Sequence, residues 1–393
     1  MPAPFSIICL SSQEWREHLP TNRQQIMLRA ARRGHEVLFV EAGHFIGKHL
    51  WRLLRGPERK SLARRLFATE AVHPNVRLRT DVNLLPWGTR YRVVGRLNAW
   101  PTGLVLGRLS RKLPQPAVLW IYHPSAVALA GHCSESLVVY DCVDDYAEQA
   151  RDRRRANLIA KDDERTSVAA RLVFATTTTL YQRHLERNRR TYLVPNVADY
   201  EHFAQAADAS SAASDVASLP RPVVGFAGNF MSSKVDFDLI ENVAKARPSW
   251  TLLLIGPADA SSEQQLRRLV TNDNIYWVGR QRYEDLPRYI AAFDVGIIPY
   301  LTNAYTRSCF PLKLYEYLAA GKPVVASGLP DLAGKEPDVV LANGVDDFID
   351  GVQNALSQGA TTDTQRRQAL AAQNTWETRT GRLLDLVASE LGA

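Results

Sequence analysis

Two series of short apolar segments, separated by stretches with helical periodicity, restrict the folds that this chain can adopt. Each segment is rich in β-branched and aliphatic residues and is too short for a buried helix. The first series comprises residues 5–10, 37–40, 118–122, 137–140 and 172–175, and the second comprises residues 223–227, 251–255, 275–278, 295–298 and 324–326. Strands that alternate with helices are typical of parallel sheets covered by helices. The sequence therefore predicts an α/β protein with two parallel sheets.

A chain of 393 residues is long enough for two domains, each with its own core. Residues 205–222 contain many Ala, Ser, Asp and Pro residues and few large apolar ones, which favours a linker. We therefore predict a first domain at residues 1–204 and a second at residues 223–375. The pattern of residues 363–393 is helical.

Cysteine spacing and hydropathy indicate the compartment. Cys9, Cys133, Cys142 and Cys309 lie far apart and form no C-x-x-C pair. This spacing predicts neither a disulfide framework nor a metal site and suits a reducing compartment. The N-terminal sequence MPAPFSIICLSS has no basic leader, and no run of about eighteen apolar residues occurs. We expect a cytoplasmic protein that spans no membrane and is at most peripheral on its inner face.

Charge is unevenly distributed along the chain. Residues 1–200 contain 31 Lys and Arg against 18 Asp and Glu, whereas residues 201–393 contain 17 against 23, so the first half should meet an anionic partner. Residues 47–67 carry seven basic residues and one acid between Leu and Trp side chains, with a break at Gly56-Pro57. This pattern indicates two short helices on an anionic membrane surface. A basic helix pair packed on its own domain is the alternative.

The segment FPLKLYEYLAAGKPVVAS, residues 310–327, combines a helix start, a helix stop and a buried strand. Apolar residues recur at helical spacing, so Lys313 and Glu316 project away from the packed face. A carboxylate can accept hydrogen bonds from two vicinal hydroxyls, and amide groups at a helix start favour a diphosphate. The segment therefore indicates a nucleotide-sugar site. A solvent-facing Lys and Glu on an ordinary amphipathic helix is the alternative.

This pattern resembles the group 1, family 4-like glycosyltransferases of the GT-B fold, in which a Glu ahead of an A-x-G-x-P-V-V run binds the ribose; Glu316 matches that Glu. The resemblance implies two Rossmann-like domains with parallel sheets facing a central cleft. It also implies that a C-terminal helix, residues 376–393, crosses back to the first domain. The implied reaction needs no metal and no cofactor, and its donor is a nucleoside-diphosphate sugar, with UDP as the expected nucleotide.

Further donor residues follow from the resemblance and from the strand ends of the second series. A G-F-A-G-N turn lets the backbone approach a ligand, and Lys234 matches a diphosphate contact, although Asn229 replaces the family's usual Arg. Ser308 replaces a Glu of many retaining members, and Lys313 matches a Lys of the inverting glucuronosyltransferases of xanthan assembly. The alternatives are that the glycines of this turn serve only strand-to-helix packing and that the arginines at residues 280 and 282 are only solvated surface residues. The predicted donor-binding set is Gly228, Asn229, Lys234, Arg280, Tyr283, Tyr305, Ser308, Lys313 and Glu316.

Carboxylates gather just after the strand at residues 137–140, where Asp141, Asp144 and Asp145 follow one another closely. Their repulsion and partial burial should raise at least one pKa, and one carboxylate could take the proton of an acceptor hydroxyl. Asp144 is the candidate base, because its V-Y-x-x-x-D segment is similar to that of the same glucuronosyltransferases. Capping of a helix near residue 147 by Asp144 or Asp145 is the alternative.

Two other strand ends supply candidates in the first domain. His123 is a second catalytic candidate, as a base or as a contact to the donor sugar, unless it is only a hydrogen-bonded loop residue. Trp15, Arg16 and His18 follow the first strand and are predicted to bind the acceptor, with Trp15 offering a ring that could stack on a sugar or pack in the core.

Together these features predict a hexosyltransferase that moves a hexose or uronic acid to a carbohydrate acceptor, lipid-linked at the membrane face, in cell-surface polysaccharide or glycolipid assembly. A nucleotide-sugar epimerase of the same fold is the alternative enzyme, but it would not need the basic segment. A nucleotide- or nucleic-acid-binding protein without enzymatic activity is the alternative from another class. No nucleic-acid motif accompanies the charge, so no nucleic-acid partner is expected. A nicotinamide oxidoreductase is disfavoured because no G-x-G-x-x-G follows either first strand.

Overall fold

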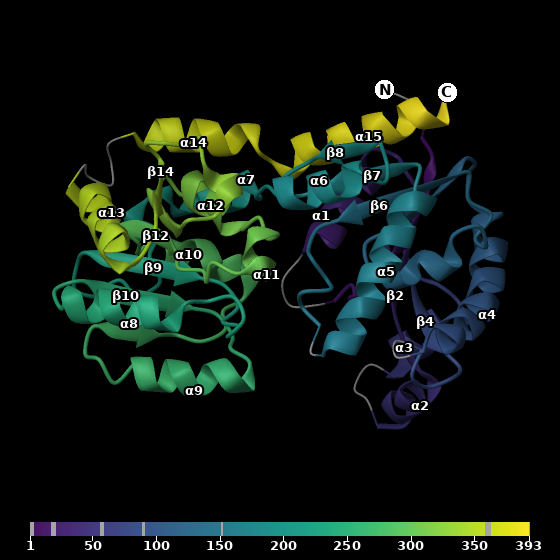
Figure 1. Cartoon of the computed structure of the whole chain (residues 1–393), viewed down its shortest axis with the longest axis horizontal. Coiled ribbons are helices and arrows are strands. Elements are labelled where there is room, and N and C mark those ends of the chain that lie inside the picture. Colours follow the sequence, from purple (N-terminus) through teal and green to yellow (C-terminus); the bar gives the residue numbers. More distant parts are fainter. Residues whose placement is uncertain are drawn as a thin grey trace. The chain divides into compact units, whose positions relative to one another are not determined.

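The computed structural model of the chain describes residues 4–16, 21–55, 59–88, 91–150, 152–357 and 363–392. These residues form two compact units (Figure 1). Unit 1 consists of Met1–Pro195 together with Arg379–Ala393, and unit 2 consists of Asn196–Thr378.

Unit 1 contains a sheet of eight described strands in the order β3-β4-β2-β1-β5-β6-β7-β8. Neighbouring strands are parallel, except that β3 pairs antiparallel with β4 at the edge. Without β3, this is the order of a doubly wound Rossmann sheet. The strands are β1 (Ser6–Leu10), β2 (Val37–Phe45), β3 (Glu70–His73), β4 (Val76–Asn83), β5 (Ala117–Ile121), β6 (Leu137–Cys142), β7 (Leu172–Ala175) and β8 (Thr191–Leu193).

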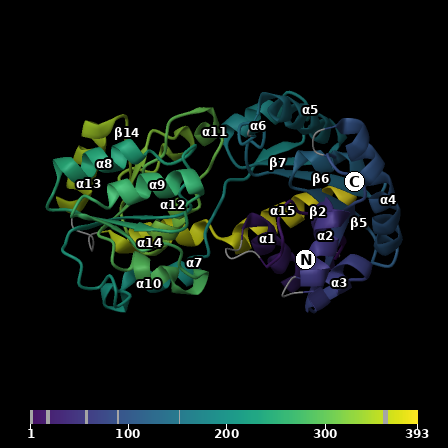
Figure 2. The ribbon, with the colours of Figure 1, turned by 90° about the horizontal axis from the view of Figure 1, so that it is seen from below.

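Helices cover both faces of this sheet (Figures 1 and 2). Polar caps explain where some of them begin: Asp152 accepts a hydrogen bond from the Arg155 amide, and Thr177 accepts one from the Leu180 amide. The helices are α1 (Asn22–Arg32), α2 (Ile46–Arg55), α3 (Arg59–Phe67), α4 (Arg92–Ser110), the 3₁₀ helix η1 (Pro124–Leu129), α5 (Arg153–Ala169), α6 (Thr178–Leu185) and most of α15 (Trp376–Leu391).

Unit 2 contains a fully parallel sheet in the order β11-β10-β9-β12-β13-β14, again a Rossmann order. Its strands are β9 (Val223–Ala227), β10 (Thr251–Ile255), β11 (Ile275–Trp277), β12 (Val295–Ile298), β13 (Val324–Ser327) and β14 (Val339–Ala342). Its α-helices are α7 (Tyr200–Ala204), α8 (Phe237–Ala246), α9 (Ala260–Leu269), α10 (Leu286–Ile290), α11 (Ala304–Arg307), α12 (Lys313–Ala319), α13 (Val345–Ser357) and α14 (Thr364–Gln373).

The strand order in each sheet reverses next to its first strand. In unit 1 the reversal lies between β1 and β5, and in unit 2 it lies between β9 and β12. Loops after the carboxyl ends of these two strand pairs leave the sheet in opposite directions, which opens a crevice where doubly wound sheets bind ligands. Each unit is therefore expected to hold its ligand at that edge.

The C-terminal helix is tied to unit 1 by buried and exposed ion pairs. Asp141 at the end of β6 is fully buried, and its Oδ1 lies 3.3 Å from a guanidinium nitrogen of Arg379 on α15. Near the end of α15, Glu390 pairs with Arg171 at 2.6 Å and with Arg190 at 3.0 Å. The predicted return of the C-terminal helix to the first domain is confirmed, and Asp141 has a structural role there.

The segment predicted as a linker, residues 205–222, is part of unit 2. Much of it is exposed, but Ala206, Ala213 and Val216 are buried in the unit 2 core. The division between the units falls after Pro195 instead. Low apolar content was misleading here because three small apolar side chains are enough to anchor this segment to the core.

Candidate active site

Three glycines hold neighbouring strand ends of unit 2 together. Gly256, directly after β10, has a φ of +133°, and a Cβ there would lie 1.9 Å from the carbonyl oxygen of Gly228, directly after β9. The Gly256 amide donates to the Gly279 carbonyl beyond β11 at 2.8 Å. Only glycine allows this approach, so the three loops start at one place on the sheet edge.

Gly228 also makes room for Lys313. A Cβ at position 228 would lie 3.0 Å from both Cε and Nζ of Lys313, which opens α12. The Lys313 ammonium donates to the Tyr300 hydroxyl at 2.7 Å and lies 5.2 Å from the ring centroid of Phe226. Among the described residues it forms no ion pair within 4 Å, so its charge is available to an anion.

Tyr300 connects Lys313 with Lys234. The Lys234 ammonium lies 4.8 Å from the Tyr300 ring centroid and 5.8 Å from that of Tyr305. The backbone supports this arrangement, because the Leu301 amide donates to the Lys234 carbonyl at 2.9 Å and Val235 forms a β-bridge with Tyr300. Two ammonium groups thus flank one buried phenol at the strand ends, an arrangement whose charge could stabilise a dianionic group.

Tyr300 was missed by sequence reasoning. It stands two residues after β12, at the carboxyl end of the strand next to β9, and this position is the signal that could have identified it. In the sequence, Tyr300 looks like an ordinary core aromatic residue, and in the structure it is indeed only 2% exposed. Its hydroxyl orients the Lys313 ammonium, which only the folded structure reveals.

Glu316 lies one helical turn after Lys313 and is half-buried. Burial raises the pKa of its carboxyl group to about 7, an effect that the positive charge of Lys313 partly opposes. The ionised carboxylate is therefore poorly solvated in the unliganded protein. Hydrogen-bond donors such as sugar hydroxyls would stabilise it.

Two other predicted donor residues are buried in the loop at α11. Tyr305 is near Lys234, and Ser308 is 1% exposed. The Ser308 hydroxyl makes no hydrogen bond within the described part of the chain. A buried hydroxyl without a partner costs free energy, about 1–3 kcal/mol, that a ligand could recover. Asn303 caps this helix and ties the loop to the Ser233 carbonyl at 3.0 Å, beside Lys234.

The remaining predicted donor residues are Asn229, Arg280 and Tyr283. Asn229 and Arg280 are exposed. The Tyr283 ring stacks on His202 at 4.3 Å and packs edge-on against Phe203. Tyr283 therefore presents a platform whose position is fixed by α7, as a nucleobase wall would need to be.

The three aspartates at and just after the end of β6 in unit 1 have different surroundings. Asp145 is the capping residue, because its Oδ1 accepts from the amides of Ala147 and Glu148, and its other oxygen pairs with Arg183 at 2.6 Å. Burial raises the pKa of Asp141, which Arg379 lowers again. Asp144 is half-buried and interacts electrostatically with Arg23. The capped segment forms turns, and the predicted helix near residue 147 is wrong, since α5 begins only at Arg153.

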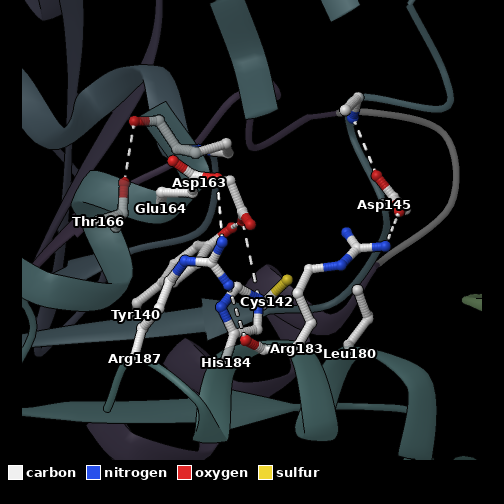
Figure 3. Close-up of polar contacts among 12 residues, drawn as sticks. Tyr140, Cys142, Asp145, Asp163, Glu164, Thr166, Leu180, Arg183, His184 and Arg187 are labelled. Atoms are coloured by element: carbon white, nitrogen blue, oxygen red, sulfur yellow. Dashed lines mark hydrogen bonds and ion pairs between the residues drawn. The ribbon is translucent and has the colours of Figure 1, made fainter. Parts of the chain in front are cut away.

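A buried network fixes the floor of this segment (Figure 3). The Tyr140 hydroxyl donates to Asp163 at 2.5 Å, and His184 lies 3.7 Å from the same carboxylate. Potential metal-ligating atoms of Cys142, Asp163 and His184 lie within 4.8 Å of one another. Because Asp163 is already hydrogen-bonded to Tyr140, we interpret the group as a network that positions the end of β6, and the expectation of no metal stays a prediction.

His123 lies beside the acidic segment at the end of the neighbouring strand, β5. Its ring is 4.7 Å from that of Tyr146, and its Nδ1 accepts from the Ser125 amide at 3.2 Å. Burial lowers the pKa of His123 to about 4, helped by the charge of Arg23. A neutral ring that accepts at Nδ1 carries its proton on Nε2, so His123 is suited to donate a hydrogen bond and poorly suited to act as a base.

Arg23 on α1 links these groups. It donates to the Tyr146 hydroxyl at 2.8 Å and stacks over the Tyr122 ring at 5.2 Å. Burial opposes its charge, but Tyr146, Tyr122 and Asp144 together raise the pKa of Arg23 above its ordinary value. Asp144 therefore lies in the electrostatic field of a buried cation, which also acts on His123.

A cavity of about 640 Å³ opens in unit 1 at the carboxyl ends of β1, β2, β4 and β5. His123 lines it, together with residues of α4, η1 and α5. Its charged lining residues are Glu41, Asp81, Arg92, Arg96, Arg155, Asp162 and Arg165. Arg92 pairs with Asp162 at 2.9 Å, whereas Arg96 and Arg155 are exposed. The cavity thus combines apolar walls with charges of both signs, and two of its arginines are exposed.

The predicted acceptor residues after β1 do not line this cavity. Trp15 packs edge-on against Phe39 at 4.9 Å, and its amide donates to Glu41 at 3.0 Å, so its packing role is the one observed. Arg16 pairs with Glu70 at 3.0 Å. His18 lies outside the described residues. Ser11 and Ser12 occupy the cavity wall instead.

The basic segment at residues 47–67 forms two helices, as predicted, but they differ. On α2, Leu50, Trp51 and Leu54 are exposed by 54%, 60% and 77%. On α3, Leu62 and Leu66 are buried, so its apolar face belongs to the core and the membrane interpretation is wrong for α3. No helix within the described ranges is long and apolar enough to cross a membrane.

Solved structures share this fold over nearly the whole chain. Sucrose-phosphate synthase from Thermosynechococcus elongatus aligns with a TM-score of 0.74 at 15% identity and covers 99% of both chains. HepE from Anabaena, solved in complex with UDP, aligns with a TM-score of 0.69 at 16% identity and covers 98% of this chain and 100% of its own. The fold is therefore the GT-B fold, with two Rossmann-like units.

Sequence comparison specifies the family among proteins of that fold. Residues 221–358 match the model of the family described as glycosyl transferases group 1. The TuaH protein of Bacillus subtilis, named as a teichuronic acid biosynthesis glycosyltransferase, is 30% identical over 278 residues, which are 66% of this chain and 68% of that protein. The chain belongs to the group 1 glycosyltransferases, and the predicted family is confirmed.

Proposed function

We propose that this glycosyltransferase moves a hexose or uronic acid from a UDP sugar to a carbohydrate acceptor in cell-surface polysaccharide or glycolipid assembly. The observation that carries the proposal is the group of Lys234, Tyr300 and Lys313 at the strand ends of unit 2, with Glu316 one turn further along α12. The two ammonium groups match a diphosphate, and the carboxylate matches ribose hydroxyls. Support for UDP comes from HepE, a structural neighbour solved with that nucleotide.

The two lysines also supply the leaving-group chemistry. When the bond between the anomeric carbon and the diphosphate breaks, negative charge develops on the diphosphate, and fixed cations stabilise it. Lys313 is held for this task by Tyr300 at 2.7 Å. A lysine pair can therefore replace a divalent ion, which is why we propose a metal-independent reaction without a cofactor.

Unit 1 is proposed to bind the acceptor and supply the base. Asp144 takes the proton of the attacking hydroxyl as its oxygen bonds to the anomeric carbon, and the diphosphate leaves with the former bonding electrons. His123, neutral with its proton on Nε2, donates a hydrogen bond to a sugar oxygen. Such a direct displacement inverts the anomeric configuration. The cavity beside His123 is the proposed acceptor site.

A lipid-linked acceptor fits the surface of unit 1. The similarity to TuaH, named for teichuronic acid biosynthesis, supports a role in the assembly of a cell-surface polymer. The exposed Leu50, Trp51 and Leu54 of α2 alternate in the sequence with basic residues, which suit anionic headgroups. We propose that the protein works at the cytoplasmic membrane face as a peripheral protein.

Thermal unfolding with nucleoside diphosphates tests the donor proposal. A ligand that binds only the folded protein stabilises it, by about 2.7 kcal/mol at a hundredfold excess over Kd. We expect uridine diphosphate to raise the melting temperature more than guanosine or thymidine diphosphate. The Lys313→Met variant should melt like the wild type without nucleotide and show a much smaller shift with it. If none of the three nucleotides shifts the wild-type melting temperature, the donor proposal fails.

A further inference from the structure

Exposed large apolar side chains are concentrated in two segments of unit 1. Apart from Val168, Val270 and Tyr276, those in the described residues all fall within residues 45–54 and 84–104. Lone exposed apolar residues are ordinary, but a concentration of this kind indicates a surface that meets something apolar. The first segment is α2, and the second, which the sequence pattern did not single out, is α4 with the loop before it.

Four side chains form one strip along α4. Val93, Leu97, Trp100 and Leu104 are spaced by four, three and four residues, which places them on one helix face, and they are exposed by 69%, 57%, 65% and 45%. Trp87, just before the helix, is exposed by 68%. The opposite face is buried at Asn98, Thr102 and Leu106. We call the five exposed side chains the α4 strip.

The α4 strip begins next to the exposed face of α2. Strands β2 and β4 run parallel, and Phe45 at the end of β2 pairs in register with Asn83 at the end of β4. Helix α2 follows Phe45 directly, and the exposed Leu84 and Leu85 follow Asn83. The two apolar segments therefore begin at adjacent positions on the same edge of the unit 1 sheet.

The charge of residues 84–115 indicates what the α4 strip binds. Residues 84–115 contain six basic residues and no acidic one. The side chains of Arg96, Arg108 and Lys112 are exposed among the apolar ones. A protein core would exclude these cations, whereas the interface of an anionic bilayer accepts both the guanidinium groups and the tryptophan rings. We propose that the α4 strip, together with α2, docks on an anionic lipid surface.

The other side of α4 lines the cavity. Arg92, Gly95, Arg96 and Ala99 contribute to its wall. One helix thus separates the proposed lipid surface from the proposed acceptor site. This second part of the inference rests on the proposed function: with α4 at headgroup depth, a lipid-linked sugar could enter the cavity while its lipid stays in the membrane.

Flotation of the full-length protein with vesicles tests the docking surface. We expect it to float with vesicles of phosphatidylcholine and phosphatidylglycerol at low salt, and to be released by high salt. The Trp87→Ser/Trp100→Ser variant should bind at least about tenfold more weakly, because two large apolar side chains no longer enter the interface. The Arg108→Gln/Lys112→Gln variant should also bind several-fold more weakly. Val168→Ser, an exposed apolar residue of α5, is the matched control and should bind like the wild type.

Several results would overturn the docking proposal. The first is that the tryptophan variant binds vesicles as tightly as the wild type. The second is that the wild type binds pure phosphatidylcholine vesicles equally well. The third is that the wild type is a dimer in solution whereas the tryptophan variant is a monomer. Brominated lipids should quench wild-type tryptophan fluorescence more than that of the variant, which needs no assumption about binding strength. The uridine diphosphate melting shift should be equal in both proteins, so failure of the donor proposal would be recognised separately.

Discussion

The Asp144→Asn variant should lose sugar transfer by about 10²- to 10⁴-fold, the usual contribution of a general base. Asparagine keeps the size of the side chain but cannot take a proton. Because Asp144 is only half-buried and asparagine has nearly its shape, the substitution should leave folding intact. The initial rate of transfer to a carbohydrate acceptor measures the loss, and the nucleotide-dependent melting shift should remain as in the wild type.

Asp145→Asn is the matched control for that variant. It breaks the 2.6 Å pair with Arg183 at a carboxylate that is 4% exposed, so it should lower stability, by about 1–3 kcal/mol, more than it lowers the turnover of the folded fraction. The two neighbouring aspartates are thus expected to show opposite patterns. Near-normal turnover of Asp144→Asn would remove Asp144 as the base.

The Glu316→Gln variant should be more stable than the wild type above pH 7 and bind nucleotide more weakly. Burial raises the pKa of Glu316 from 4.5 to about 7, so the folded protein holds a proton there that the unfolded chain releases. Wild-type stability should therefore fall as pH rises from about 4.5 to 7. The shift corresponds to at most about 3 kcal/mol, and solvent at this half-buried site reduces the effect to about 1–2 kcal/mol.

Nucleotide binding should show the opposite pH dependence. Ribose hydroxyls donate to the ionised carboxylate, so wild-type affinity should weaken as pH falls below 7, by at most about tenfold per pH unit. Glu316→Gln should lose about tenfold or more at pH 8, because charge-assisted hydrogen bonds are replaced by weaker ones. Calorimetric titration with uridine avoids the titration of the phosphate groups. An unchanged affinity of the glutamine variant would separate Glu316 from the ribose.

Much of the fold could be predicted because buried parallel strands have a simple sequence signature. Each of the ten predicted strand segments corresponds to a strand in the structure, and the predicted and observed ends differ by a few residues at most. Strands β3, β4, β8 and β14 were missed. Strand β4 carries three charged residues in eight, and β8 has only three residues, so neither shows the continuous apolar run of a central strand. Edge and near-edge strands are only partly covered, which permits such compositions.

The candidate site was predictable where a local motif carries it and unpredictable where distant residues meet. Glu316 and Lys313 share one short helix, so their spacing was visible in the sequence. The contact of Lys313 with Tyr300, and the division of roles between Asp144 and Asp145, depend on side chains from other elements. Trp15 was ambiguous because a ring near a strand end can stack on a sugar or on Phe39, and the sequence does not distinguish these partners.

Hydrogen–deuterium exchange with and without the best-binding nucleoside diphosphate tests most directly whether unit 2 grips the donor with Lys313 and Glu316. We expect protection in residues 228–235 and 303–316, the segments that carry both lysines, Ser308 and Glu316. The Lys313→Met variant should lose that protection at the same nucleotide concentration. Protection confined to unit 1, or binding that leaves both segments unchanged, would contradict the account.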